Sequence, residues 1–370
     1  MPLFNMNRDK SPTIQRLSRL EGIIDFCEAR PIFENDQQRS QAIRKFRRIV
    51  AFYEEAKQHS SPRRDRYNRP ALIRLTFEYA RSSESQDKFL GVFFRSLALE
   101  MLDDNDGEDA SVRGLFFGFA DSLIYHFFLP LLAATDKTPQ PTPTYHSAVQ
   151  QGQTEEEQQR MLDLMSTPQR LAALQGTCLT RDRHNDEGEE QDDEGEEQDD
   201  KDEYHCLEVA HILPFSLTKT ENNQLSKKAA IAFLNMFDSG VIHLIEGTDI
   251  DRPYTAITLS CNMHGLFGKF KIFFKPVIGT PNTYEISAFK PAVRRYFKLP
   301  INRTLFSHET IDPPAKRLLE LHSAIGHILH LSGAGNYISV ILRDMEAGEV
   351  RADGSTQLGA IVNAALVIKG

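Results

Sequence analysis

The motif AHILPFS (210–216) overlaps the end of a short apolar run, CLEVAHILP (206–214), whose last residue is a proline. Further along, DRPYTAITL (251–259) contains a second short apolar run, and MHGLFGKFKIFF (263–274) follows it after three residues. Short aliphatic and β-branched runs bounded by turn residues are typical of buried strands. The pattern therefore predicts strands at 206–214 and 254–259, followed by a short helix that begins within 262–267.

Helical periodicity dominates the residues before this stretch. Apolar side chains recur three and four positions apart in 41–57 and 87–102, and 155–175 is also predicted to be helical, with Pro168 at the start of a second helix. The alternating prolines of TDKTPQPTPT (135–144) disfavour a helix. The chain is therefore divided into a helical N-terminal domain (1–134), a proline-rich linker (135–152) and a second domain (153–370).

The residues after the central stretch again mix strand and helix patterns. Residues 270–274 and 284–289 are predicted to pair as strands, and 313–343 is predicted to be helical with a break at LSGAGNY (331–337). CLT (178–180) is predicted to begin the non-helical part of the second domain. The predicted fold class is α+β: a helical N-terminal region, a small α+β core and a helical C-terminal tail.

The composition is that of a globular protein in a reducing compartment. Of the 370 residues, 40% are hydrophobic and 26% are charged, which excludes a wholly disordered or collagen-like chain. The four cysteines form no C-x-x-C pair, and the N-terminal residues contain no continuous apolar run of the kind found in signal peptides. We therefore expect an intracellular protein, in the nucleus or the cytoplasm, that is not secreted.

One segment, LFFGFADSLIYHFFLPLLAA (115–134), is apolar over about the length that a bilayer needs. It carries Asp121, Ser122 and His126 near its middle, and a central aspartate costs about 2.5–3.5 kcal/mol on membrane insertion. A buried core helix is therefore predicted, and a membrane helix is the less favoured alternative.

Five pieces of sequence occur in order after residue 177. They are CLT (178–180), AHILPFS (210–216), DRPYTAITL (251–259), MHGLFGKFKIFF (263–274) and HLSGAGNYISVILRDMEAGEVRADGS (330–355). In these pieces and their order, the span from Cys178 to the C-terminus resembles the fungal branch of the HNH endonuclease family. Five ordered pieces are more specific than a single AHI-x-P would be, and the second domain is accordingly predicted to be HNH nuclease-like.

The resemblance implies a ββα-metal fold, in which two strands and a helix hold one divalent ion. By position, His211 is the general base that activates water, and His264 is the metal ligand on the helix. Histidine suits the base role because its reference pKa of about 6.5 leaves it largely neutral near pH 7. The implied activity is hydrolysis of DNA phosphodiester bonds with Mg²⁺ or another divalent metal ion, which neutralises charge at the scissile phosphate.

Two positions depart from the family's pattern. Thr255 in DRPYTA stands where the family usually has an asparagine that helps hold the base, so the catalytic role at this position rests on a shorter hydroxyl side chain. Ala210 stands where many members have a further Asp or His ligand, and Glu208 is predicted to face away from His211 in a regular strand. Asn262 is a candidate neighbour of the ion or, alternatively, a helix N-cap. The alternative to an active nuclease is a catalytically inactive HNH-fold scaffold or binding protein.

Basic residues mark two places for phosphate contact. Lys269, Lys271 and Lys275 lie next to the predicted site and would share one face of a strand, although an ordinary amphipathic strand has the same pattern. For a second cluster, within 39–74, the functional alternatives are a phosphate-contacting surface and a localisation signal, and a solvated helix face followed by a basic loop is the simpler interpretation. The predicted partner is DNA, protein partners stay open, and no membrane partner is expected.

The net charge of −9 does not exclude DNA as a partner, because the acidity is local. Residues 186–203 hold thirteen acids and one lysine, and without them 42 basic residues face 39 acidic ones, a balance of +3. The tandem DEGEEQD repeat here predicts a solvated, disordered insertion, and a mimic of nucleic acid is the alternative. A zinc site is not favoured at the flanking residues, whose spacing is unusual for zinc: Cys178, His184, His205 and Cys206.

Overall fold

The computed structural model describes residues 33–58, 67–102, 110–135, 165–182, 207–214, 233–305, 310–347 and 361. Some of the predictions fall outside these ranges. They are the linker beyond residue 135, the first part of the 155–175 helix, the acidic insertion at 186–203, and the candidate zinc residues His184, His205 and Cys206.

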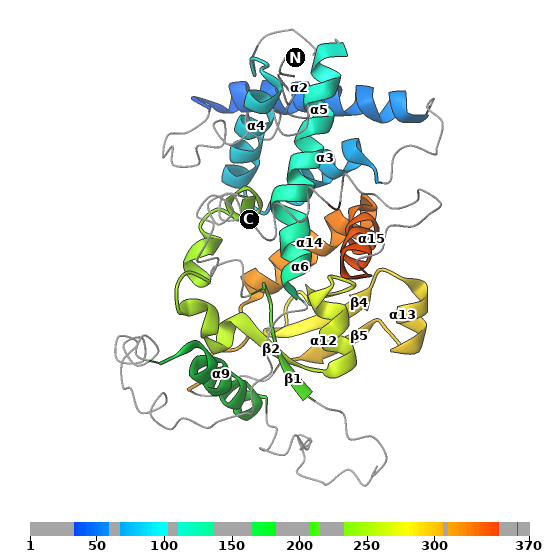
Figure 1. The fold of residues 1–370 in the computed structure, drawn as a ribbon. Coiled ribbons are helices and arrows are strands. Elements are labelled where there is room, and N and C mark those ends of the chain that lie inside the picture. Colours follow the sequence, from blue (N-terminus) through cyan, green and yellow to red (C-terminus); the bar gives the residue numbers. More distant parts are fainter. Residues whose placement is uncertain are drawn as a thin grey trace, which may run out of the picture.

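The N-terminal region is helical, as predicted. Phenylalanine rings fill its centre, with the ring centroid of Phe46 lying 4.8 Å from that of Phe77 and 5.0 Å from that of Phe93. One predicted boundary is wrong, because Ala98 adopts a left-handed backbone (φ 53°) and ends its helix at Leu97 rather than at 102. The elements, drawn from blue to cyan in Figure 1, are α2 (Asp36–Gln58), α3 (Arg69–Glu78), α4 (Ser83–Leu97), α5 (Ala110–Leu123), the π-helical turn η1 (Ile124–Phe128) and α6 (Leu129–Thr135).

The apolar segment predicted to be a core helix runs through the middle of this region. Val112–Thr135 is long and apolar enough to cross a membrane, by length and composition only, and 67% of its most apolar window is buried inside the protein. Asp121 on this segment accepts hydrogen bonds from the Tyr67 hydroxyl at 2.6 Å and from Arg69 Nε at 2.9 Å. The segment thus packs as a core helix, with its one carboxylate paired.

A two-stranded antiparallel sheet and the helix that follows it lie in the C-terminal half. In the pair formed by β1 (Leu207–His211) and β2 (Ala256–Ser260), the last residue of β1 lies opposite the first residue of β2. Helix α12 (Cys261–Gly268) follows β2 without a loop and packs against both strands. Both strands and the helix were predicted from the sequence, and β2 begins later than expected because Pro253–Thr255 form a 3₁₀ turn, η4.

Helix α9 (Thr167–Arg181) packs against the same two strands. Its first turn contains Pro168, as predicted. The expectation that CLT (178–180) begins a non-helical part is wrong, because these residues form the last turn of α9. The helix continues through these residues because Cys178 packs with Leu174, one turn earlier, in a small buried cluster with Val209 of β1 and Ala256 of β2.

A second antiparallel sheet has the strand order β3 (Ile272–Pro276), β4 (Thr283–Ala288), β5 (Ile301–Thr304). The predicted pairing of the first two strands is confirmed. The shared face predicted for three lysines is wrong, because Lys269 caps α12, Phe270 adopts a positive φ of 53°, and β3 begins only after Lys271. The other helices here are α13 (Pro291–Tyr296), α14 (Lys316–Leu331), which packs on β3, and α15 (Ala334–Ala347).

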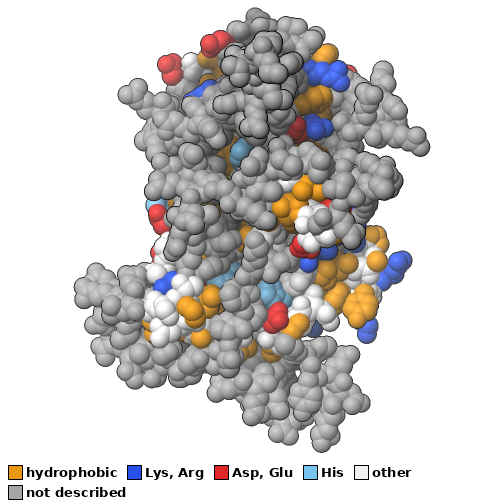
Figure 2. All heavy atoms as spheres, viewed as in Figure 1, with side chains coloured by type: hydrophobic (Ala, Val, Ile, Leu, Met, Phe, Trp, Pro, Cys, Tyr) orange, Lys and Arg blue, Asp and Glu red, His pale blue; other side chains and the backbone are white. Residues whose placement is uncertain are grey.

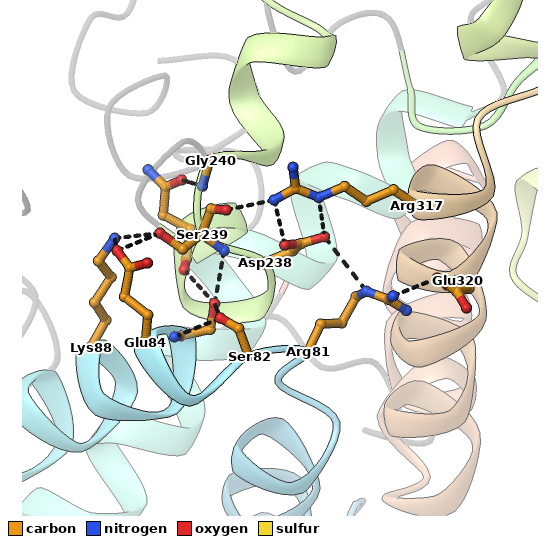
Figure 3. A network of polar contacts seen from close by, with 11 residues as sticks. Arg81, Ser82, Glu84, Lys88, Asp238, Ser239, Gly240, Arg317 and Glu320 are labelled. Carbon is orange, nitrogen blue, oxygen red and sulfur yellow. Dashed lines mark hydrogen bonds and ion pairs between the residues drawn. The ribbon is translucent and has the colours of Figure 1, made fainter.

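A polar network joins the N-terminal helices to the C-terminal half (Figure 3). At its centre is Asp238, whose side chain is 7% exposed and accepts hydrogen bonds from Arg317 of α14 at 2.8 and 2.6 Å. Arg81, between α3 and α4, lies 3.5 Å from the same carboxylate and also pairs with Glu320. Lys88 of α4 adds a hydrogen bond to the Ser239 hydroxyl at 2.7 Å.

One large hydrophobic core joins most of these parts, since the same buried cluster contains residues of α2 to α6, of both sheets and of α12, α14 and α15, whereas α9 contributes to the separate small cluster. The protein is therefore a mixed fold of helices and small antiparallel sheets, with a helical N-terminal region. The division into domains at 134 and 152 stays a prediction.

Candidate active site

The two histidines singled out in the sequence line one small pocket. His211 is the last residue of β1, and His264 lies in the first turns of α12. Apolar groups and a third histidine complete the lining, which consists of Thr135, Ile212, Pro214, Gly268, Phe270 and His322. The cavity volume is about 20 Å³, enough for an ion or one to two water molecules. The pocket therefore suits a small inorganic group or one protruding substrate atom.

A carboxylate stands behind His264. The Nδ1 atom of His264 lies 2.5 Å from Glu208 Oε2, and the two side chains are 17% and 28% exposed. An ionised carboxylate can only accept a hydrogen bond, so the proton of this contact belongs to Nδ1. The neutral ring then keeps its lone pair on Nε2, which is the arrangement that a carboxylate gives to a metal-ligating histidine.

The position of Glu208 corrects one inference from the sequence. Strand alternation does turn it away from His211, as predicted, but the face it occupies is the one that α12 covers. Glu208 shares that face with Ala210, two residues along, where the family often has a ligand. The spacing of two residues was the signal that would have identified Glu208 as part of the site.

A second carboxylate stands beside His211. Asp251 Oδ1 lies 3.7 Å from His211 Nε2, which is an ion-pair distance rather than a hydrogen bond, and the Asp251 side chain is fully buried. Its other oxygen, Oδ2, accepts a hydrogen bond of 2.7 Å from Arg170 Nε of α9. The buried aspartate is thus held by Arg170 and directs negative charge at the histidine. Nothing in the sequence spacing pointed to Arg170, which lies 81 residues away from its partner.

Thr255 holds the loop before β2 rather than the histidine itself. Its buried hydroxyl lies 2.6 Å from the carbonyl oxygen of Ile250 and 2.7 Å from that of Arg252, and one proton serves both acceptors. Its own carbonyl oxygen accepts a hydrogen bond of 2.8 Å from the backbone N–H of Ile212, next to His211. Thr255 therefore positions both the loop that carries Asp251 and the end of β1.

Arg181 ties α9 to the same loop. Its side chain is fully buried and donates to the carbonyl oxygens of Pro253 at 2.7 Å and Ala256 at 3.2 Å. Such charge-assisted contacts to backbone carbonyls lock the loop against the helix. One turn earlier, burial raises the pKa of the Cys178 thiol to about 12, so it stays protonated and behaves as a packing residue.

The remaining predicted site residues lie outside the pocket lining. Asn262 is exposed on α12, and the helix N-cap is Ser260, so the alternative assignment of Asn262 as the cap is wrong. Lys269 is exposed directly after the pocket residue Gly268, and Lys275 is exposed on β3, whereas Lys271 is half-buried. Lys269, between the pocket residues Gly268 and Phe270, and Lys271, directly after Phe270, are both next in sequence to the pocket.

The donors present offer a metal ion one nitrogen ligand. Within the described ranges, no group of three or more His, Cys, Asp and Glu side chains is arranged to hold a metal. His264 with Glu208 behind it still fits an ion whose other ligands are water and phosphate oxygens, the way Mg²⁺ is commonly held. The residues therefore fit a metal that is completed by substrate rather than one enclosed by the protein.

His322 of α14 forms the apolar side of the pocket. Its ring stacks on Phe267 and Phe270, with centroids 3.9 and 4.4 Å apart, and its Nε2–H donates to the Phe267 carbonyl oxygen at 2.9 Å. Burial lowers the pKa of His322 to about 3, so the ring is neutral at physiological pH. A neutral, stacked His322 adds no positive charge to the pocket.

Comparison with known proteins adds one finding. Residues 180–275 match a family model described as HNH endonuclease, about a quarter of the chain. No curated protein and no solved structure matches the chain significantly. The matched region contains β1, the loop with Asp251 and Thr255, β2 and α12. The matched region, which supplies six of the eight residues that line the pocket, is thus similar to the HNH endonuclease family.

Proposed function

We propose that this protein is a metal-dependent HNH-type endonuclease that hydrolyses phosphodiester bonds in DNA. The observation that carries the proposal is the pairing of each pocket histidine with a carboxylate, His211 with Asp251 and His264 with Glu208. The match to the HNH endonuclease family model supports a nuclease and, with it, nucleic-acid binding. Such an activity agrees with the expected location in the nucleus or cytoplasm.

His211 acts as the general base in this proposal. Its neutral imidazole takes a proton from the attacking water, which leaves a cationic ring in a buried position with a side-chain exposure of 3%. Asp251, 3.7 Å away and itself held by Arg170, stabilises that cation. The apolar lining by Ile212 and Phe270 limits solvent near the ring and so strengthens this electrostatic stabilisation.

His264 would hold the divalent ion through Nε2. When bound, the ion would supply positive charge to the scissile phosphate and its leaving oxygen. Glu208 keeps the proton on Nδ1 and fixes the ring's orientation against α12. Lys269 and Lys275 are the exposed lysines nearest in sequence to α12 and are proposed to contact flanking phosphates.

The proposal is tested by incubating supercoiled plasmid with the purified full chain and Mg²⁺ or Mn²⁺. Nicking is expected with either ion and should disappear when EDTA removes it. Intact plasmid with both ions contradicts the proposal and favours a catalytically inactive HNH-fold scaffold. Two observations favour that alternative. Within the described residues, His264 is the one nitrogen ligand assigned to the metal ion, and Ala210 stands where many family members have a further ligand.

Replacing Glu208 by alanine is expected to weaken metal binding by about 10- to 100-fold, because His264 loses the acceptor that orients it. The measurement is the Mn²⁺ concentration that gives half-maximal nicking. Glu246→Ala, at an exposed position outside the pocket lining, serves as the matched control and should leave that concentration unchanged. An unchanged metal requirement in the Glu208 variant would show that Glu208 does not orient the metal ligand.

A further inference from the structure

A basic surface outside the pocket lining is formed by α13, the residues beside it and strand β5 of the three-stranded sheet. The segment KPAVRRYFKLPINR (290–303) contains five basic residues and no acidic one. All five are exposed, and helix α13, which carries two of them, buries none of its residues. We call this surface the α13 patch; its residues are Lys290, Arg294, Arg295, Lys298, Arg303 and the aromatic Tyr296.

The charges of the α13 patch are not neutralised within the described part of the chain. None of its five basic side chains forms an ion pair there, in contrast to Arg81 and Arg317, which are paired with carboxylates. Arg294 donates from Nε to the Ala288 carbonyl oxygen, which holds α13 against β4. The patch is therefore a set of free positive charges on a fixed support, which favours a polyanionic partner.

An exposed aromatic ring stands among these charges. Tyr296 is 76% exposed, and its only described ring contact is an edge-on one with Phe297, at 4.8 Å between centroids. A large ring in water next to cations is an arrangement typical of proteins that stack unpaired bases while contacting the phosphate backbone. The patch thus offers phosphate contacts and a stacking surface together.

The fold connects the patch rigidly to the candidate active site. α13 packs on β4, β4 pairs with β3, and β3 follows α12 in the chain with three residues between them. Figure 2 shows the Lys and Arg side chains projecting at the right edge of the molecule, over α13, on a face that also exposes histidine atoms in the region of α12. One nucleic-acid strand can therefore reach both places on one side of the protein.

We infer that the α13 patch docks the DNA substrate outside the pocket, binding its phosphate backbone and stacking Tyr296 on an unpaired base. The substrate class is accordingly DNA with a single-stranded stretch. This inference rests on the proposed function for the identity of the polyanion, but it concerns binding and can be tested without catalysis.

The test is fluorescence anisotropy of short labelled oligonucleotides, one single-stranded and one duplex, with the full chain in EDTA so that cleavage does not interfere. The double variant Arg295→Glu/Lys298→Glu should bind both probes about 10- to 60-fold more weakly near 0.1 M salt. The slope of log affinity against log salt should become shallower by about 1.4–1.8, as expected for two lost phosphate contacts. Tyr296→Ala should weaken single-strand binding by about 5- to 100-fold and duplex binding much less.

The matched control is Arg113→Glu/Lys316→Glu, which makes the same charge change at exposed positions of α5 and α14, outside both the α13 patch and the basic cluster at 39–74. It should bind like wild type; equal losses in both double variants, or no DNA binding by wild type, would overturn the inference. Thermal unfolding of each variant checks that it is folded. The outcomes separate from those of the proposed function: patch-dependent binding without plasmid nicking rejects the nuclease alone, and nicking with patch-independent binding rejects the patch alone.

Discussion

Replacing His211 by alanine is expected to lower metal-dependent plasmid cleavage by about 10²–10⁴-fold, the usual contribution of a general base. The loss follows because no other described group in the pocket can take its place: His264 is engaged with Glu208, and His322 is buried with a strongly lowered pKa. The measurement is the single-turnover rate of nicking at saturating Mn²⁺.

The controls separate loss of the base from loss of the fold. His243→Ala removes an exposed histidine outside the pocket lining and should leave the rate unchanged. The His211 variant should bind DNA in EDTA as wild type does, since the base makes no contribution to phosphate contacts on the α13 patch. A His211 variant that cleaves within a few-fold of wild type would assign the base to another group.

Lowering the pH from 7 to 5 is expected to reduce the free energy of unfolding by about 2 kcal/mol through His322 alone. The pKa of His322 is lowered from 6.5 to about 3 in the folded protein, so the unfolded chain binds the proton more tightly. The stabilisation is therefore complete above pH 6.5 and is lost progressively as the pH falls from there towards 3. Burial also lowers the pKa of His327 and His330, and both add to the loss with the same sign.

Urea unfolding at pH 7, 6 and 5 measures this effect. His322→Phe keeps a ring between Phe267 and Phe270 but cannot titrate, so its stability should fall by about 2 kcal/mol less than that of wild type over the same pH range. The variant starts from a lower stability at pH 7 because the Phe267 carbonyl oxygen loses its donor. If the free energy of unfolding falls equally with pH in the two proteins, protonation of His322 costs the folded protein little stability.

The secondary structure around the site followed from local pattern. Short apolar runs predicted both strands of the first sheet, and the helix carrying His264, predicted to begin within 262–267, begins at Cys261. Two of the boundaries that failed depended on single backbone conformations: the positive φ of Ala98 ended one helix early, and that of Phe270 separated α12 from β3. A non-glycine residue with positive φ has little sequence signature, because its cost is offset by packing elsewhere.

The sequence alone determined which residues are chemically capable: two histidines, and the apolar runs that place His211 at the end of a strand and His264 on a short helix. Only the tertiary structure decided which carboxylate serves each histidine, since Glu208 meets His264 across 56 residues and Arg170 fixes Asp251 across 81. Within the described ranges, it also left the basic side chains of α13 without acidic partners. The physical reason is that periodicity reports which face of an element is buried, whereas the partner on that face is set by how separate elements pack.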